Sequence, residues 1–310
     1  MSQHDAPIAY LARTRAWYLA LGYDTPYDWA RHDDAPFFAL DKPLTATTVA
    51  LVTTAAPYRP EHGDQGPGAP YNAAAKFWQV YSGDSAIDHD LRIAHVAIDR
   101  QHTTMRDSAC WFPLPRLRAL AARGVLRLAP RFHGFPTNRS QRQTVEVDAP
   151  ELLARCRADG VEAALLIANC PVCHQSLALA ARHLEAHGIA TVVLGCARDV
   201  VEQVGVPRFL FSDFPLGNAA GRPHDPAAQE LTLLLALNLL GEAAAPRTTW
   251  QSPLRWPGPA DWKLDYANPE RIAAEQLARL RDEAEAARLA ARAQREATLG
   301  QTDQPAFCSL

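Results

Sequence analysis

The stretch that decides the fold is VEAALLIANCPVCHQSLALAARHLEAHGIATVVLGC, residues 161–196. It begins with a mostly apolar run over 161–170 and ends with a second one over 189–196, and such runs are typical of buried parallel strands. Between them the apolar residues have helical spacing, with Pro171 in the first turn and Gly188 after the last. The stretch therefore predicts a strand–helix–strand unit of a parallel sheet.

The same alternation of strands and helices extends from this unit in both directions. Short connections of this kind require a parallel sheet whose two faces are covered by helices. We therefore predict an α/β fold with parallel sheets flanked by helices, arranged as Rossmann-like or flavodoxin-like lobes. The expected strands lie at 47–54, 91–99, 125–134, 161–170, 189–196 and 206–213, and the expected helices at 8–21, 113–124, 148–160, 171–188, 197–205, 225–243 and 269–298.

Changes in composition divide the chain into four predicted segments. Residues 1–45 form an irregular or helical N-terminal segment, 46–147 a first α/β lobe, and 148–245 a second lobe that carries a C-x-x-C motif. Residues 246–310 hold a Trp/Pro-rich segment, a long helix and a tail. The charges of that helix alternate in sign, which predicts a solvated or subunit-bridging charged helix and favours a homo-oligomer.

Charge and hydropathy exclude several classes of protein. Among 310 residues, 31 basic and 34 acidic side chains leave a net charge of -3, which argues against a dedicated nucleic-acid binder. The longest apolar run, 231–240, is about half the length of a membrane span, and the N-terminus lacks the pattern of a signal peptide. We expect a cytoplasmic protein that binds neither membranes nor nucleic acid.

Polar and nucleophilic residues follow the expected strands, where ligands of open parallel sheets bind. These residues are Thr53, Thr54, Asp99, Arg100, His102, His133, Cys170, Cys173, Cys196 and Asp213. A loop with amide and guanidinium groups after the 125–134 strand suits a substrate carboxylate. Our candidate substrate-binding residues are Thr54, His133, Cys196 and Asp213, together with Asn138 and Arg139 of that loop. We interpret His89, His95, Asp99 and His102 as separate hydrogen-bonding residues and predict no metal site.

The sharpest feature is the segment Asn169-Cys170-Pro171-Val172-Cys173-His174. The strand ends at Asn169, so the C-x-x-C occupies the first turn of the next helix. Unpaired backbone N–H groups and the positive helix end favour a thiolate there. The two sulfurs are near enough for a reversible disulfide, and His174 and His133 are the candidate acid–base groups. We predict Cys170, Cys173 and His174 as catalytic residues.

Three other interpretations of the thiol pair stay open. Cys170 and Cys173, with His174 or Cys196, form a possible ligand set for zinc or an iron–sulfur cluster. Cys170 and Cys196 are the candidates for opposed acid and base in a racemase-like enzyme. A non-catalytic subunit of a reductase complex is the third alternative.

Over about residues 47–245 the sequence resembles the selenoprotein B family of glycine, sarcosine, betaine and D-proline reductases. The most specific segments are C-P-V-C-H-Q, the V-V-L-G strand end and F-P-L-G-N-x-x-G-x-P. The resemblance implies that Cys170 and Cys173 take the place of the family's redox-active pair, one member of which is a selenocysteine there. In those reductases the selenolate attacks the carbon next to the substrate amine and expels the amine, while a pyruvoyl group on another subunit activates it.

Both positions of the pair are cysteine in this chain, and a thiol is a poorer leaving group than a selenol. We therefore expect a thiol-dependent reductase of a small polar molecule, such as an amino-acid derivative or a sulfur or nitrogen compound. One cysteine attacks and the other resolves the intermediate as a disulfide. We predict no cofactor in this chain, an external thiol or thioredoxin-type electron donor, and subunits of a reductase complex as possible partners.

Overall fold

The computed structural model describes most of the chain, namely residues 6–23, 25, 27–66, 69, 72, 75–93, 95, 97–137 and 140–299. The core of the described region is an eight-stranded sheet in the order β10-β9-β8-β7-β1-β6-β3, with β5 paired to β1 beside this path. Its strands are β1 (Thr48–Thr53), β3 (Tyr81–Asp84), β5 (Arg127–Leu128), β6 (Arg131–Gly134), β7 (Ala163–Ile167), β8 (Ala190–Gly195), β9 (Arg208–Phe211) and β10 (Thr248–Gln251).

The pairing within the sheet is parallel except at one edge, where β3 runs antiparallel to β6. Strands β7 and β8 are buried along their whole length, because helices cover both faces and leave no side of these strands in water. The prediction of an α/β fold built on a parallel sheet flanked by helices is therefore confirmed.

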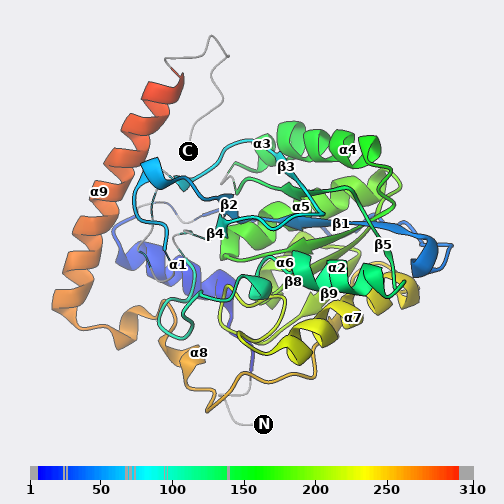
Figure 1. Ribbon diagram of the computed structural model, residues 1–310. Coiled ribbons are helices and arrows are strands. Elements are labelled where there is room, and N and C mark those ends of the chain that lie inside the picture. The colour runs from blue at the N-terminus through cyan, green and yellow to red at the C-terminus, as the bar shows by residue number, and fades with distance from the viewer. Residues whose placement is uncertain are drawn as a thin grey trace.

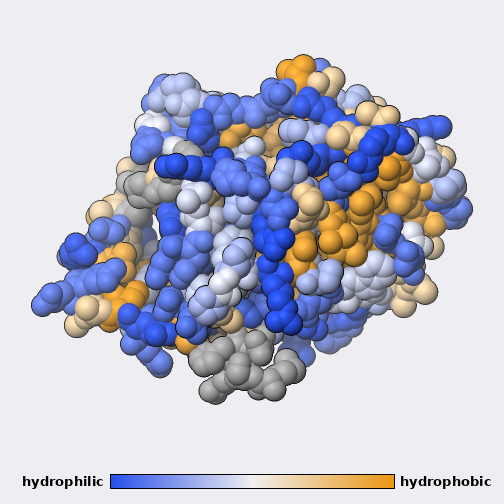
Figure 2. Space-filling view, turned by 60° about the horizontal axis from the view of Figure 1, so that its bottom comes forward, coloured by the Kyte–Doolittle hydropathy of each residue, from blue (hydrophilic) through white to orange (hydrophobic). Residues whose placement is uncertain are grey.

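Helices lie on both faces of this sheet (Figure 1). Helix α5 (Pro171–Ala186) packs on β8 and contacts α4 (Ala149–Ala158) and α6 (Arg198–Val204). On the other face, α2 (Leu114–Ala122) contacts α7 (Pro226–Glu242), which packs on β8 and β9. An apolar area visible in Figure 2 lies on the side where Figure 1 shows α7. No helix in the described part combines the length and hydropathy that a bilayer-crossing segment needs.

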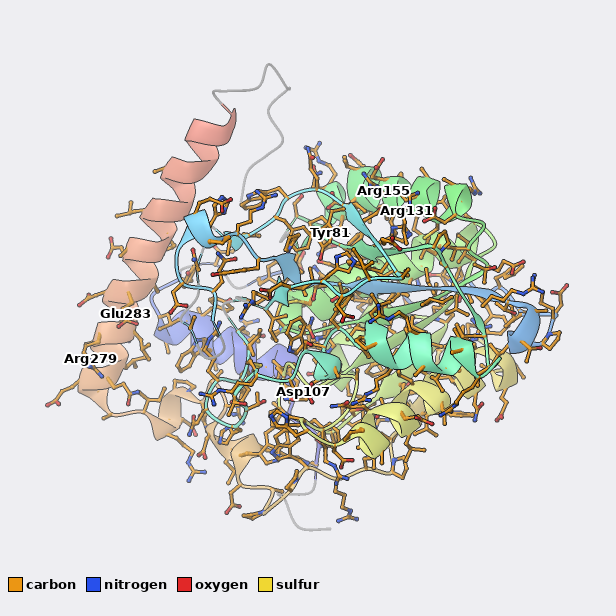
Figure 3. The ribbon with its side chains drawn as sticks, in the orientation of Figure 1. Tyr81, Asp107, Arg131, Arg155, Arg279 and Glu283 are labelled. Atoms are coloured by element: carbon orange, nitrogen blue, oxygen red, sulfur yellow. A yellow bond between two sulfur atoms is a disulfide. The ribbon has the colours of Figure 1, made fainter. Side chains whose placement is uncertain are left out.

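The remaining α-helices and strands of the described region are α1 (Tyr10–Ala20), α3 (Gln141–Gln143), α8 (Trp262–Asp265), the long α9 (Ala274–Leu299), β2 (Ala56–Pro57) and β4 (Leu91–Arg92). The charged C-terminal helix was expected and is present as α9. Arg279 and Glu283 are exposed on it and point away from the body of the protein (Figure 3).

The strand expected over 91–99 is wrong in extent and in place. Among the described residues of this segment, Leu91–Arg92 alone form a strand, and it pairs antiparallel with β2 in a separate two-stranded sheet. Local polar contacts bend the later part of this segment, because the Asp99 carboxylate accepts the backbone N–H groups of Gln101 and His102, each at 3.1 Å. Such side-chain contacts to the backbone compete with sheet pairing.

The expected lobes, 46–147 and 148–245, both contribute strands to this one sheet, where β1 of the first lies between β7 of the second and β6. The division of the chain into four segments stays a prediction.

One buried ion pair connects the sheet, helix α5 and the N-terminal segment. The Arg208 guanidinium on β9 donates to the Glu185 carboxylate of α5 and to the carbonyl of Phe38, both at 2.8 Å. Both charged side chains are fully buried, and burial raises the pKa of the Glu185 carboxyl to about 7 despite the opposing effect of the Arg208 charge. A carboxylate held this way depends on its cation, because an unpaired buried charge is costly.

Replacing the cation of this pair should destabilise the fold strongly. We expect Arg208→Met to lower the free energy of unfolding by about 3–5 kcal/mol at pH 8, because the buried Glu185 must then either stay charged without its cation or take up a proton that the unfolded chain does not bind at this pH. Urea unfolding measures the effect, and adding Glu185→Gln should recover part of it. Arg198→Met is the matched control: Arg198 and Glu202 form an exposed pair at 2.9 Å, so its loss should cost less than about 1 kcal/mol. Equal losses in the two single variants would contradict the assignment.

Candidate functional site

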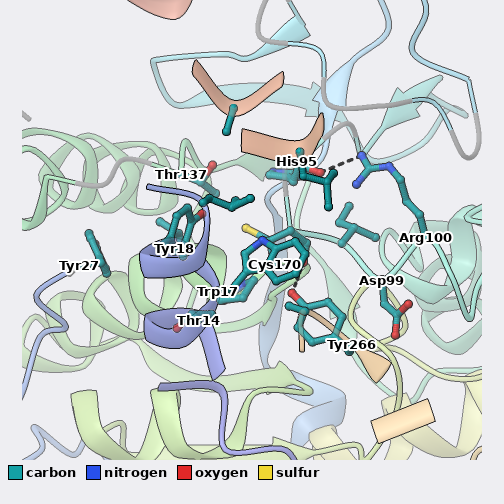
Figure 4. A pocket seen from close by; sticks show the side chains of 18 of the residues that line it. Thr14, Trp17, Tyr18, Tyr27, His95, Asp99, Arg100, Thr137, Cys170 and Tyr266 are labelled. Carbon is teal, nitrogen blue, oxygen red and sulfur yellow. Dashed lines mark hydrogen bonds between the residues drawn. The ribbon is translucent and has the colours of Figure 1, made fainter. Parts of the chain in front are cut away.

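A cavity of about 820 Å³ lies where α5 begins after β7. Cys170, Pro171 and Val172 form part of its wall, and most of the rest comes from α1, α9 and the described parts of segments 21–29, 72–78, 95–101 and 265–272, with Ala56 and Thr137. Figure 4 shows Cys170 between Trp17 of α1 and His95. Much of the wall is aromatic: Trp17, Tyr18, Tyr23, Tyr27, Trp29, Phe77, Trp78 and Tyr266. Such a wall, with few charged groups, suits a small molecule that has an apolar part.

The thiol pair lies at the start of α5, as predicted. Cys170 is the N-cap residue, and its Sγ accepts the backbone N–H of Cys173 at 3.2 Å. The two Cα atoms are 4.9 Å apart and the sulfurs are joined as a disulfide, so the pair is close enough to form one. Cys170 is 5% exposed and lines the cavity, whereas Cys173 is fully buried behind it. The helix N-terminus favours negative charge on the outer sulfur.

His174 holds the start of α5 against the next strand–helix junction. Its Nδ1 donates to the Cys170 carbonyl at 2.7 Å, and its Nε2 accepts the backbone N–H groups of Cys196 at 2.8 Å and Ala197 at 3.1 Å. Burial lowers the pKa of His174 to about 4, so the ring is neutral near pH 7. With both nitrogens occupied by backbone groups, these contacts favour a positioning role over the predicted acid–base role.

His95 is the residue at this site that the sequence interpretation missed. One of its ring nitrogens and the two sulfurs of the pair all lie within 4.8 Å of one another. Burial, together with the charges of Lys76 and Arg100, lowers the pKa of His95 to about 3, so its imidazole is also neutral. The Arg100 guanidinium donates to the His95 carbonyl at 2.8 Å (dashed in Figure 4) and fixes this part of the wall. These three side chains are the donors that could hold a metal ion here.

Two other predicted residues lie near the pair without lining the cavity. Thr54 is buried at the end of β1, where its Oγ1 accepts from the Asn169 amide at 3.0 Å and joins the ends of β1 and β7. Cys196 is buried after β8, and burial raises the pKa of its thiol far above the usual value. Its side chain is therefore a neutral thiol, and its backbone N–H rather than its sulfur reaches the site.

The remaining predicted substrate-binding residues lie elsewhere. Asp213 forms an ion pair with Lys263 of α8, which neutralises it. His133 is buried on β6, with Nδ1 at 2.9 Å from Ser82 Oγ and Nε2 at 3.6 Å from Asp159. Neither Asp213 nor His133 lines the cavity. Asn138 and Arg139 fall outside the described residues.

A signal for part of the cavity wall was present in the sequence of α9. Four residues of this helix line the cavity at a constant spacing of four: Gln276, Leu280, Ala284 and Arg288. This spacing places them on one side of a helix. The pattern is hard to recognise among the alternating charges of the helix, because small or polar residues occupy three of the four positions, Gln276, Ala284 and Arg288.

A side chain at position 195 should disturb the site through His174. A Cβ added to Gly195 would lie 2.5 Å from both Cδ2 and Nε2 of the His174 ring, which packs directly on this glycine. We expect Gly195→Ala to lower the free energy of unfolding by about 1–3 kcal/mol, as overpacking does, measured by urea unfolding. Gly241→Ala is the control, because a Cβ there meets nothing within 4 Å, and in helix α7 it should raise stability by up to about 1 kcal/mol. An unchanged stability of Gly195→Ala would refute this packing argument.

Protonation of His133 should make the fold less stable in acid. Burial lowers its pKa from 6.5 to about 4, so the unfolded chain binds the proton first as the pH falls through this window. The free energy of unfolding that His133 contributes should then drop by about 2 kcal/mol between pH 7.5 and pH 5. His133→Asn, whose amide can still bond to Ser82, should show a pH dependence shallower by that amount in urea unfolding. Parallel curves for the two proteins would exclude His133 as the source.

The chain is similar to a curated protein named D-proline reductase subunit gamma, from Acetoanaerobium sticklandii. The two are 32% identical over 204 residues, which cover 65% of this chain and 81% of the relative. No protein-family model and no solved structure matches the chain. The relative is a reductase subunit, which supports an oxidoreductase-type function at that coarse level. The chain therefore belongs to the selenoprotein B family of glycine, sarcosine, betaine and D-proline reductases, as the resemblance in its sequence predicted.

Proposed function

We propose that this chain is a thiol-dependent reductase of a small polar molecule and that the Cys170 thiolate is its attacking group. The observation that carries the proposal is the position of the Cys170 sulfur. It lies in the cavity wall, accepts an N–H group of the helix start, and has Cys173 within disulfide distance behind it. An attacking sulfur that borders the cavity, with a second sulfur enclosed behind it, is the arrangement that a dithiol reduction needs.

The proposed reaction transfers two electrons from the dithiol to the substrate. The Cys170 thiolate attacks the substrate and displaces a leaving group, which departs with a proton, so that a bond joins the sulfur to the substrate. The Cys173 thiolate then attacks Cys170 Sγ, and the substrate leaves with the electron pair of that bond and takes up a proton. The substrate is reduced and the cysteines are oxidised to the disulfide. An external dithiol, of thioredoxin type, reduces the disulfide again.

In this proposal the other residues of the site position the attacking cysteine and bind the substrate. His174 fixes Cys170 through its carbonyl, and Arg100 is one of the cations in the described wall, with Lys76, Arg271 and Arg288, that suit a substrate carboxylate. The loop residues Asn138 and Arg139 keep the substrate-binding role predicted for them. The aromatic wall suits the apolar part of an amino-acid derivative or of a related nitrogen or sulfur compound.

Further subunits are part of the proposal. The relative is named as one subunit of D-proline reductase, and we infer that this chain likewise works with partner subunits, in the cytoplasm and in more than one copy. A pyruvoyl group on such a partner would activate a substrate amine when it is bound. The attack on the substrate and the closure of the disulfide need only this chain's own sulfurs.

Reaction with an aromatic disulfide reagent should separate the roles of the two cysteines. With 5,5′-dithiobis(2-nitrobenzoate), reduced protein carrying Cys308→Ser, which removes the cysteine outside the described residues and serves as the wild type for every variant, should release one thiolate as Cys170 reacts and a second as Cys173 displaces the label. Cys173→Ser should keep the label on the peptide that contains Cys170, because nothing resolves the mixed disulfide. Cys170→Ser should react slowly, because Cys173 is fully buried. Absorbance of the released thiolate and mass spectrometry of the protein measure these outcomes.

Cys156→Ala is the matched control, since Cys156 is a buried free cysteine on α4. It should behave as the wild type. The turnover of candidate substrates such as D-proline, assayed with partner subunits present, should be lost in both single variants of the pair. Full turnover in either variant, or prompt labelling of Cys173 in Cys170→Ser, would overturn the proposal.

A further inference from the structure

We propose that the reduced protein binds a thiophilic divalent ion such as Zn²⁺ through Cys170, Cys173 and His95. The donor atoms of these three side chains lie within 4.8 Å of one another. Zinc bonds of about 2.3 Å to sulfur and 2.0–2.1 Å to nitrogen place tetrahedral ligands about 3.5–3.8 Å apart. Reduction frees the two sulfurs from their mutual bond, and small rotations then bring the donors to these separations.

The orientation of His95 is that of a metal ligand. Its Nδ1 is buried and has no hydrogen-bond partner within the described part of the chain. The backbone of Thr54 raises the pKa of the ring, so an accepting backbone group lies beside it. A ligating histidine characteristically donates its other ring N–H to such a group, which fixes the tautomer and leaves the lone pair of the first nitrogen for the ion. A buried imidazole nitrogen without a partner beside two sulfurs is otherwise unexplained.

The structure revises the ligand sets that the sequence left open. His174 has no nitrogen to offer, because backbone groups occupy both of them. Cys196 is not part of the cluster of donors. His95 supplies the third ligand instead. Because Cys170 and His95 both line the cavity, the fourth position of the ion faces it and is open to water or to a donor atom of a small molecule.

Binding of the ion and formation of the disulfide exclude each other. The ion replaces the protons of the two thiols, so two protons leave as two metal–sulfur bonds form. The disulfide has no thiolate to offer and leaves only His95, which cannot hold the ion alone. The bound ion also occupies the sulfurs that attack and resolve in the proposed reductase reaction. Zinc is therefore a reversible inhibitor of that reaction, and this consequence alone rests on the proposed function.

Zinc titration of untagged protein tests the site. The protein is reduced without oxygen, freed of reductant and titrated with Zn²⁺ against a chromophoric chelator, and the bound metal is counted by elemental analysis. We expect one tightly bound zinc per reduced chain, and an affinity at least about 100-fold weaker after oxidation with diamide. X-ray absorption of the zinc-loaded wild type should show two sulfur atoms and at least one nitrogen around the ion, which tests the ligand set without any substitution.

Variants of the three ligands complete the test. Cys170→Ser and Cys173→Ser should abolish tight binding, and His95→Ala should weaken it by more than about 100-fold, beyond the usual effect of an outer-sphere change. His187→Ala is the control, because this exposed histidine at the far end of α5 should leave the affinity unchanged. Wild-type affinity in His95→Ala, equal affinity of the oxidised and reduced proteins, or no zinc in the reduced protein would overturn the site. Any of these results leaves the outcome of the disulfide-reagent experiment unaffected, so the two proposals fail separately.

Discussion

The geometry of the site depends on one buried imidazole that joins two strand–helix junctions. His174 receives N–H groups from the junction after β8 and donates to the carbonyl at the junction after β7. Parallel strands bring these junctions to the same edge of the sheet, but sheet pairing alone does not fix the distance between them. The ring does so, and Gly195 leaves the room for it. The backbone at Cys170 is therefore positioned by contacts that do not involve the sulfur.

This arrangement separates positioning from chemistry. The sulfur of Cys170 keeps its freedom to bond to Cys173, to a substrate or to an ion, because its backbone carries the constraint. The second sulfur is enclosed, so reagents in the cavity meet Cys170 first. A neutral His174 adds no net charge behind the pair, and the only fixed electrostatic contribution of α5 is the positive end of its own helix.

The elements that could be predicted are those whose own sequence shows a distinct pattern of apolar residues. Strands β1, β7, β8 and β9 are almost entirely buried, so their sequences are nearly continuous apolar runs. The edge strands β3 (YSGD) and β10 (TTWQ) are short and half-exposed, and their sequences look like those of loops. The segment 91–99 was predicted as a strand from its apolar residues, but Leu91, Ile93 and Ile98, which the structure describes, are buried without joining the main sheet.

The same distinction between local patterns and long-range contacts holds for the residues of the site. The C-x-x-C at a helix start is a local pattern, and the sequence alone identified it. The neighbourhood of His95 is a contact between segments 75 residues apart in the chain, 95 and 170, and no spacing rule connects them. Likewise, the sequence could place His133 near the end of a strand, but not decide that its side chain turns toward Ser82 and Asp159, close to the charges of Arg131 and Arg155, instead of toward the cavity.

Part of the cavity wall comes from a different region of the chain than the sulfurs. Helices α1 and α9 supply part of the lining, and both lie outside the region, about 47–245, that resembles the reductases. The central region can therefore keep its sulfur chemistry while the two ends of the polypeptide diverge. Relatives that share the core and differ in these end helices would offer differently shaped chambers to their substrates, so selectivity and reactivity can evolve at separate rates in one protein.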